Sequence, residues 1–529
     1  MSKIIRLGIA MLLSSIQAFS SDISEGEWVG GSDLFESPAY MHVDISMGNE
    51  TKGTINIPQW KVVKRPLLKL NIQNDRIYFE IFSNTGVPFV AEGRFVDGHI
   101  EGTISRGDKK GKFHLISIKK VSSVILSKYV GSYQIPDPNN KGVLLPHLIT
   151  YSANGHLRFV NLVDGSTSPL LPITEKKFFF AGSVMTSPVP LNTVSFSDGK
   201  FSIHIEGRPE MIGTTVSTIN VEEITVQAKD HSLAGTLLLP TVGKKHPVVI
   251  VVPGSQGLNR DDNTPYEEIN TFISNGFGLL IYDKPGTGQS GGDWQKSSYE
   301  QLAEDVLAFV EKLRSRKDID RSKIGAWGFS QGATIAPLAA SLSRDISYVI
   351  MQSGGGVTPA ESEINQQVAR MQVQKLSDTA IMEAIEFMKL QFKAVNDPQA
   401  WDSFQIKALS VKDKPWYRYT WGGLPKDHWI WKWWRPVVNH DPAAALHKVK
   451  VPVLVIFGTS DPLVPKDSID GMISRITSAL TIAGNKQVTV AKFQGANHEI
   501  FVQNEKKEFK LAPGYDETLK KFILMIKSR

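Results

Sequence analysis

Three residues in the C-terminal half of the chain have the types and settings that acyl transfer to a serine requires. The first is Ser330, at the centre of the G-x-S-x-G pattern of residues 328–332. An apolar stretch ending at Trp327 precedes the pattern and the small-residue segment 332–336 follows it, which indicates a strand, a tight turn and a helix. Only glycine on both sides lets strand and helix approach so closely, and the turn lifts the hydroxyl clear. We therefore predict that Ser330 is a nucleophile.

A serine hydroxyl is a weak nucleophile until a base takes its proton, and an imidazole with a pKa near ~6.5 suits that task at neutral pH. His498 stands in a Gly-x-x-His loop directly after the segment 488–493, which has the composition of a strand. A loop that leaves a strand at this point brings its imidazole to the same edge of the sheet as Ser330. His498 is the predicted base.

The third member must orient the imidazole and stabilise its cation. Asp461 follows the apolar segment 453–457, and the resulting chain order Ser, Asp, His is a known order for such a triad. Other acids, such as Asp441 and Glu499, fit the end of a strand less well. Asp461 is therefore the predicted acid.

A serine that forms a tetrahedral intermediate also needs hydrogen-bond donors for the oxyanion. The backbone N–H of Gln331, directly after the nucleophile, is the first predicted donor. The second is expected from the loop 253–257, which follows the apolar segment 247–252. We assign it to the N–H of Ser255, with Gln256 as the alternative.

These residues need a sheet whose strand ends meet at one edge, and from about residue 220 the pattern predicts one. Continuous apolar runs of the kind that buried parallel strands need alternate with helical periodicity, as in residues 298–314. We predict an α/β fold over residues 218–529, with a mainly parallel, doubly wound sheet.

One segment interrupts this alternation. Residues 357–447 read as helices and loops between two strands, and we predict a helical lid insertion there. The segment holds seven of the eleven tryptophans: Trp401, Trp416, Trp421, Trp429, Trp431, Trp433 and Trp434. They either line an acyl or aryl pocket or pack the insertion onto the core, and the sequence leaves both interpretations open.

The N-terminal part is predicted to be all-β. Short alternating runs separated by turn residues recur from residue 26 to about 215, with no helical period between them. Two modules are expected, residues 21–125 and 126–217, because each opens with an aromatic-glycine pattern. They resemble the small lipocalin-like β modules attached to bacterial hydrolases.

With the triad and its loops in place, residues 220–529 resemble the α/β-hydrolase superfamily, in the bacterial branch related to prolyl-oligopeptidase-type peptidases and acyl-transferring thioesterases. The resemblance includes residues 254–261 and the string YDKPGTGQS of residues 282–290. The family often has Arg in place of Pro285 and His in place of Pro253. The resemblance implies hydrolysis of an ester, amide or thioester through an acyl-enzyme, without a cofactor.

Other classes of protein are disfavoured. Residues 286–291 fit G-x-G-x-x-G, but they run into further loop residues where a dinucleotide site would open a helix. The chain has no cysteine and no zinc-ligand cluster, so we expect no metal site. Its net charge of +6 comes from scattered residues, which argues against nucleic-acid binding.

The first twenty residues have the pattern of a secretory signal peptide: a short positive start, an apolar stretch too short to span a bilayer, and a small-x-small cleavage pattern at residues 18–20. The protein is expected to be periplasmic or secreted, without a membrane span. Its oligomeric state is left open.

The leading functional hypothesis is an exported carboxylesterase for small or medium acyl esters. A short-peptide peptidase is the alternative, although no charged anchor for a peptide terminus is evident. An acyl-CoA thioesterase is disfavoured, because CoA is a cytoplasmic carrier. A hypothesis of another class is non-catalytic binding of a ligand or an envelope partner through the β modules.

Overall fold

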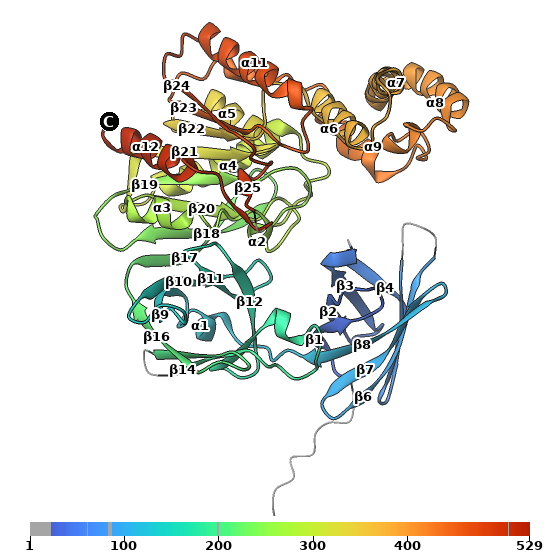
Figure 1. Ribbon diagram of the computed structural model, residues 1–529, viewed down its shortest axis with the longest axis vertical. Helices are drawn as coiled ribbons and strands as arrows, with labels where there is room; N and C mark the ends of the chain where they lie inside the picture. The colour runs from blue at the N-terminus through green and yellow to red at the C-terminus, as the bar shows by residue number, and fades with distance from the viewer. Residues whose placement is uncertain (1–22, 61, 83–86, 198–199, 506) are drawn as a thin grey trace, which may run out of the picture. The chain divides into compact units, whose positions relative to one another are not determined.

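The computed structural model describes residues 23–529 except residues 61, 83–86, 198–199 and 506 (Figure 1). The predicted signal peptide lies outside the described residues. The chain forms two compact units, one containing the segment up to Leu126 together with Ser168–Ile212, the other containing Ser127–Thr167 and Gly213–Arg529.

The first eight strands close into an antiparallel barrel, in which β8 returns to pair with β1. Alternate side chains point inward, and Trp28, Phe79 and Phe113 are buried in its core. The strands are β1 (Gly26–Ser32), β2 (Ala39–Ser46), β3 (Lys52–Ile57), β4 (Val62–Gln73), β5 (Arg76–Ile81), β6 (Phe89–Val96), β7 (His99–Arg106) and β8 (Lys109–Ser117), with a 3₁₀ turn at Pro58–Trp60.

A second closed barrel follows the short helix α1 (Ser123–Leu126). Its strands are β9 (Gly131–Pro136), β10 (Leu144–Tyr151), β11 (Leu157–Asn161), β12 (Thr167–Pro172), β13 (Lys177–Phe180), β14 (Thr193–Ser197), β15 (Lys200–His204) and β16 (Met211–Val216), with a 3₁₀ turn at Ala181–Val184. The prediction of an all-β N-terminal region is confirmed.

The rest of the chain is built on an eight-stranded sheet with the order β17-β18-β20-β19-β21-β22-β23-β24. β18 pairs antiparallel with both of its neighbours, β17 and β20, whereas every pair from β20–β19 to β23–β24 is parallel. The strands are β17 (Ile219–Gln227), β18 (Ser232–Pro240), β19 (His246–Val252), β20 (Gly278–Tyr282), β21 (Ile319–Phe329), β22 (Tyr348–Gln352), β23 (Val453–Gly458) and β24 (Val488–Phe493). The predicted mainly parallel sheet is confirmed.

Helices cover both faces of this sheet (Figure 1). Along β19, Val248 and Ile250 face one hydrophobic core, while Val249 and Val251 face the other. The first face packs against α4 (Tyr299–Arg314), α5 (Gly332–Leu342), α10 (Pro442–Leu446) and α11 (Ile469–Ile482); the second packs against α3 (Ile269–Ser274) and α12 (Tyr515–Lys527). This arrangement makes the sheet doubly wound.

The second core also contains strands of the second barrel. Leu148 of β10 and Val160 of β11 are fully buried in the same cluster as Val249 and Leu279 of the sheet. β9 to β11 therefore belong to the compact unit that contains the sheet. The remaining short elements of this unit are α2 (Arg260–Asn263), a 3₁₀ turn at Lys466–Ser468, and the hairpin of β25 (Phe501–Gln503) and β26 (Phe509–Leu511).

Residues 357–447 form the predicted helical insertion between β22 and β23 (Figure 1). Its helices are α6 (Pro359–Val373), α7 (Asp378–Asn396), α8 (Pro398–Val411) and α9 (Trp429–Trp434), with a 3₁₀ turn at Tyr417–Tyr419. Thr358, Ser377 and Asp397 cap the first three helices with their side-chain oxygens. Each cap satisfies backbone N–H groups that have no partner within the helix.

Most tryptophans of the insertion pack its interior. Trp401, Trp416, Trp431 and Trp434 are buried, whereas the side chain of Trp429 is 46% exposed. The interpretation as packing residues accounts for these four and for the partly buried Trp421, whose ring meets those of Trp431 and Trp434 at 5.5 and 5.3 Å. Trp429 and Trp433 remain for contact with a ligand.

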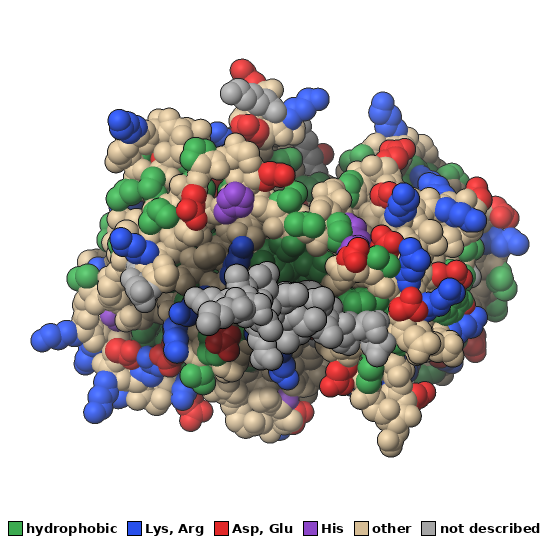
Figure 2. Space-filling model, turned by 90° about the horizontal axis from the view of Figure 1, so that it is seen from below, with side chains coloured by type: hydrophobic (Ala, Val, Ile, Leu, Met, Phe, Trp, Pro, Cys, Tyr) green, Lys and Arg blue, Asp and Glu red, His purple; other side chains and the backbone are tan. Residues whose placement is uncertain are grey.

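No helix among the described residues has the length and the hydropathy that crossing a bilayer would need. On the face shown in Figure 2, Lys and Arg side chains are interspersed with Asp and Glu.

Candidate active site

Ser330 lies at a strained turn between β21 and α5. Its φ is +54°, a left-handed conformation that is uncommon for any residue other than glycine. The Ser330 N–H donates to the carbonyl of Gln352 at 2.9 Å, which holds the turn to the neighbouring strand. A Cβ at Gly328 would lie 1.9 Å from the carbonyl oxygen of Gly332, so the turn tolerates no side chain there. Strain of this kind is concentrated at functional sites.

A buried polar cluster surrounds the side chain of Gln352, the residue whose carbonyl holds the turn. Gln352 Oε1 lies 3.1 Å from the indole Nε1 of Trp327 and 2.9 Å from the hydroxyl of Tyr515, which is also 3.0 Å from Glu268 Oε1. The single Tyr515 proton serves one of these two acceptors, and a protonated Glu268 supplies the proton for the other contact. Burial raises the pKa of Glu268 to about 8, so the carboxyl group is neutral at pH 7.

The structure brings the predicted acid and base together. Asp461 Oδ2 lies 2.6 Å from His498 Nδ1, and both side chains are buried. The loops that carry them touch closely, because a Cβ at Gly458 would lie 2.3 Å from the carbonyl oxygen of Asn497. A carboxylate on Nδ1 places the second ring nitrogen, Nε2, in the position of the base.

The imidazole of His498 lies beside the turn that carries Ser330. Its ring centroid is 5.0 Å from that of Phe329, the residue before Ser330, in an edge-to-face arrangement. The hydroxyl of Ser353 donates to the His498 carbonyl at 2.7 Å, which ties the histidine loop to the end of β22. The three residues predicted from the sequence thus converge at the carboxyl ends of β21, β23 and β24.

The two alternative acids have other roles. Asp441 caps α10 by accepting from the N–H of Ala443 at 2.9 Å. Glu499 is exposed at the surface. Asp461 is therefore the acid whose carboxylate meets the His498 ring.

The loop after β19, residues 253–257, runs against Ser330 and is called the oxyanion loop below after its predicted role. A Cβ at Gly254 would lie 3.5 Å from Ser330 Cβ, so this loop forms one wall of the space next to the hydroxyl. Within the described part of the chain, the backbone N–H groups of Ser255 and Gln331 have no hydrogen-bond acceptor. Free donors on both sides of a serine are what an oxyanion site requires. Gln256, the alternative donor, has a φ of +71°.

Lys284 is a residue of this site that the sequence pattern did not identify. Its ammonium group is buried and donates to the carbonyls of Gly254 at 2.7 Å and Gln256 at 3.0 Å, and to Gln331 Oε1 at 2.7 Å. Burial lowers the pKa of Lys284 to about 7. The string YDKPGTGQS carried the available clue, because it places a lysine directly after a buried strand.

The glycine-rich loop that contains this string folds onto Asp283. A Cβ at Gly288 would lie 2.4 Å from the Asp283 carboxylate, which accepts from the N–H of Gln289 at 3.0 Å. The hydroxyl of Ser290 donates to the Asp283 carbonyl at 2.7 Å. The loop therefore encloses a carboxylate of its own chain, in place of the phosphate that a dinucleotide-binding loop would hold.

Two ion pairs, made by neighbouring residues of α2, connect this segment to Asp283 and to the second barrel. Arg260 Nη2 lies 2.9 Å from Asp283 Oδ2. The next residue, Asp261, accepts from Arg158 Nε of β11 at 3.1 Å, from the N–H of Ala153 at 3.1 Å, and from the hydroxyl of Ser152. Residues of the second barrel thus hold α2, which directly follows the oxyanion loop.

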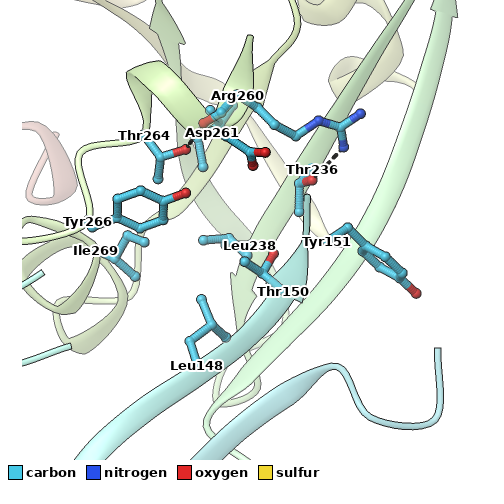
Figure 3. A pocket seen from close by; sticks show the side chains of 11 residues that line it. Leu148, Thr150, Tyr151, Thr236, Leu238, Arg260, Asp261, Thr264, Tyr266 and Ile269 are labelled. Atoms are coloured by element: carbon cyan, nitrogen blue, oxygen red, sulfur yellow. Dashed lines mark hydrogen bonds between the residues drawn. The ribbon is translucent and has the colours of Figure 1, made fainter. Parts of the chain in front are cut away.

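Figure 3 shows a small cavity beside these ion pairs, with Tyr266 and Asp261 on one side and Leu148 and Thr150 on the other. It is lined by side chains of β10, β18, β20 and the α2–α3 segment, and it has room for about one water molecule. Ser330 and His498 are not among its lining residues, so it is separate from the candidate active site.

An aromatic contact links the site to the insertion. Trp294 covers the oxyanion loop, since a Cβ at Gly257 would lie 2.5 Å from its Nε1. The ring centroids of Trp294 and Trp433 are 5.5 Å apart. Trp433 also contacts Trp429, with ring centroids 6.1 Å apart. This row of indoles offers an apolar surface next to the oxyanion loop.

Residues 247–505 match the family described as the alpha/beta hydrolase fold. Among curated proteins, the esterase EstD of Thermotoga maritima is 23% identical over 283 residues, which cover 52% of this chain and 59% of EstD. An uncharacterised 31.7 kDa protein of Escherichia coli is 27% identical over 130 residues, or 25% of this chain and 45% of the relative. The chain thus spans about half the length of the curated relatives it matches.

Solved structures with a related chain include an esterase of Pyrococcus furiosus, at 18% identity and a TM-score of 0.37, covering 59% of this chain and 91% of the esterase. The ferulic-acid complex of Est1E from Butyrivibrio proteoclasticus has 17% identity and a TM-score of 0.38, covering 58% of this chain and all of Est1E.

Proposed function

Because residues 247–505 place the chain in the α/β-hydrolase superfamily, we propose that it is a serine hydrolase that cleaves carboxylic esters through an acyl-enzyme. The observation that carries the proposal is the buried pair of Asp461 and His498, 2.6 Å apart, next to a serine with a φ of +54°. A strained serine beside a carboxylate-bound imidazole is the arrangement that activates a hydroxyl nucleophile.

In the proposed reaction, Ser330 Oγ attacks the carbonyl carbon of the ester while His498 Nε2 takes the hydroxyl proton. The carbonyl oxygen becomes an oxyanion and accepts hydrogen bonds from the N–H groups of Ser255 and Gln331. His498 then returns the proton to the leaving alcohol as the C–O bond breaks. A water molecule, deprotonated by His498, attacks the acyl-enzyme and releases the acid and the free serine.

The hydrogen bonds that the ammonium group of Lys284 already makes favour esters over short peptides as substrates. A peptidase for short peptides holds a terminal carboxylate or ammonium group with an opposite charge. Lys284 is the buried cation next to the nucleophile, and its three N–H groups are already directed at Gly254, Gln256 and Gln331. The indoles of Trp294 and Trp433 instead suit an apolar acyl or aryl group.

The test is hydrolysis of p-nitrophenyl esters from acetate to laurate by the wild type and by Ser330→Ala. We expect a clear optimum in acyl length and a loss of at least ~10³-fold in kcat for the variant. Ester hydrolysis that persists in Ser330→Ala would rule out the serine mechanism. A wild type that is inert on every ester but cleaves short peptides would favour the peptidase alternative.

Export is a separate part of the proposal, and it rests on the pattern of residues 1–20. Expression of the full chain in a Gram-negative host is expected to give a periplasmic protein whose mass corresponds to cleavage after Ser20. A chain that lacks residues 2–20 is the control and should stay in the cytoplasm. Recovery of the uncleaved full chain in the cytoplasm would contradict export.

A further inference from the structure

Lys284 is a buried cation without a counter-ion. Only 3% of Lys284 is exposed. Among the described residues, no carboxylate lies within ion-pair distance of its ammonium group. Taking a charge out of water is costly unless its hydrogen bonds are satisfied. Lys284 satisfies all three N–H groups with oxygens of the active-site wall, which indicates a role at that wall.

The first of these contacts fixes the direction of an oxyanion donor. The carbonyl of Gly254 and the N–H of Ser255 belong to one planar trans peptide group, in which they point in opposite directions. When Lys284 holds the Gly254 oxygen at 2.7 Å, the Ser255 N–H must point away from the lysine. The contact to the Gln256 carbonyl at 3.0 Å fixes the peptide group on the other side of the same loop.

The third contact reaches the residue that carries the other donor. Gln331 Oε1 accepts from Lys284 at 2.7 Å, and Gln331 Nε2 lies 3.3 Å from the hydroxyl of Tyr299 on α4. The side chain of Gln331 is thus held at both ends, at the start of α5 and directly after the nucleophile. One ammonium group therefore connects the two segments that carry the proposed oxyanion donors.

Building on the proposed function, we propose that Lys284 is a positioning residue that sets the spacing and direction of both oxyanion donors, Ser255 N–H and Gln331 N–H. A hydrogen bond from a cation to the Gly254 carbonyl also polarises that peptide group and strengthens its N–H as a donor. Both effects act on the negative charge that develops in the transition state. They leave the uncharged ester in the ground state nearly unaffected.

The proposal is tested with Lys284→Met, which keeps the length of the side chain and removes its N–H groups. Lys296→Met is the matched control, because Lys296 lies on the following loop with its side chain 80% exposed. We expect kcat for the best p-nitrophenyl ester to fall by ~10²-fold or more in Lys284→Met, with KM changed by less than about threefold. The control should keep both values.

A transition-state analogue separates positioning from general support of the fold. The Ki of an alkyl boronic acid, which forms a tetrahedral adduct with the serine, is expected to rise in parallel with the loss in kcat/KM. A Lys284→Met enzyme with raised KM but unchanged kcat, or with an unchanged boronate Ki, would overturn the proposal. If this variant does not fold, Gln331→Met removes one contact and keeps the backbone donor, and a loss of ~10-fold in kcat at constant KM is expected.

Reaction with a fluorophosphonate makes the test independent of the substrate. Its phosphoryl oxygen uses the oxyanion donors, so the labelling rate at Ser330 should fall in Lys284→Met as kcat does. If the wild type is labelled but hydrolyses no ester, the ester proposal fails and the ratio of the two labelling rates decides on Lys284. An equal rate in both proteins overturns the Lys284 proposal alone. A wild type that is not labelled at Ser330 overturns both.

Discussion

The two sides of Ser330 are built in different ways. On the proposed base side, two side chains meet in one short contact, between Asp461 and His498. On the proposed oxyanion side, the donors would be backbone N–H groups, and Lys284 makes three hydrogen bonds to the segments that carry them. The proposed base side thus depends on which side chains are present, whereas the proposed oxyanion side depends on what holds the backbone.

The largest effect is expected from the base side. In Asp461→Asn the amide can neither stabilise the imidazolium nor fix the required tautomer, so kcat for the best ester should fall by ~10⁴-fold with KM little changed. Asp441→Asn is the control, since Asp441 caps α10, and it should retain activity within a factor of about two. Equal losses in the two variants would mean that Asp461 is only structural.

A rise in pH is expected to lower activity through the oxyanion side. Lys284 needs all three N–H groups to satisfy its three acceptors, and its pKa is lowered to about 7. As pH rises through this value the group loses a proton, and activity should fall ~10-fold well below the usual pKa of a lysine, near ~10.4.

The measurement for this prediction is a profile of kcat/KM from pH 5 to 10. The alkaline decline should be present in the wild type and in Lys296→Met, and absent in Lys284→Met, whose activity is low throughout. A wild type that keeps full activity up to pH 10 would show that Lys284 does not lose its proton or that its proton is not needed.

A smaller effect on activity is expected from the second barrel. Arg158→Met leaves the partly buried carboxylate of Asp261 without its cation, which should lower the free energy of unfolding by ~3 kcal/mol. Because Asp261 lies on α2, directly after the oxyanion loop, kcat should also fall several-fold. Urea unfolding and ester hydrolysis measure the two effects. Lys389→Met, which breaks an exposed ion pair with Glu386, should change neither.

The smallest effect on activity, and a distinct effect on stability, is expected from Glu268→Gln. The pKa of Glu268 is raised to about 8 from a usual value of 4.5, so the folded protein holds a proton that the unfolded chain releases. The stabilising effect of this proton is complete below pH 4.5 and is lost as pH rises to about 8.

The glutamine variant carries no such proton and keeps a donor for Tyr515. Its stability relative to the wild type should therefore increase from pH 5 to pH 8, on the order of a few kcal/mol, while kcat at pH 7 stays unchanged. Urea unfolding at both pH values gives the difference. A constant difference between the two proteins would show that Glu268 is ionised in the fold.

The sequence predicted most of what depends on residue type and periodicity. Apolar runs such as residues 247–252 are strands of a parallel sheet, and residues 357–447 form a helical insertion, both as expected. The closure of the N-terminal strands into barrels did not follow from periodicity, because alternation is the same in a sandwich and in a barrel. Pairing of β1 with β8 is a long-range contact that only the fold reveals.

In the candidate site, too, some residues could be predicted from the sequence and others only from the fold. Asp461 and His498 could be chosen from their places after strands, because a specific chemical group is needed there. Lys284 was visible only as part of a family string, since a lysine after a strand is usually a surface residue. Its role depends on burial and on the positions of three oxygens from two distant segments, which no local pattern encodes.

Labelling with a fluorophosphonate, followed by peptide mass spectrometry, shows whether Ser330 is an activated nucleophile. We expect one label per chain, on Ser330, absent in Ser330→Ala and formed at least ~10³-fold more slowly in His498→Ala. No label on the wild type, or a label on another residue at an equal rate in Ser330→Ala, would contradict the claim that Ser330 is an activated nucleophile.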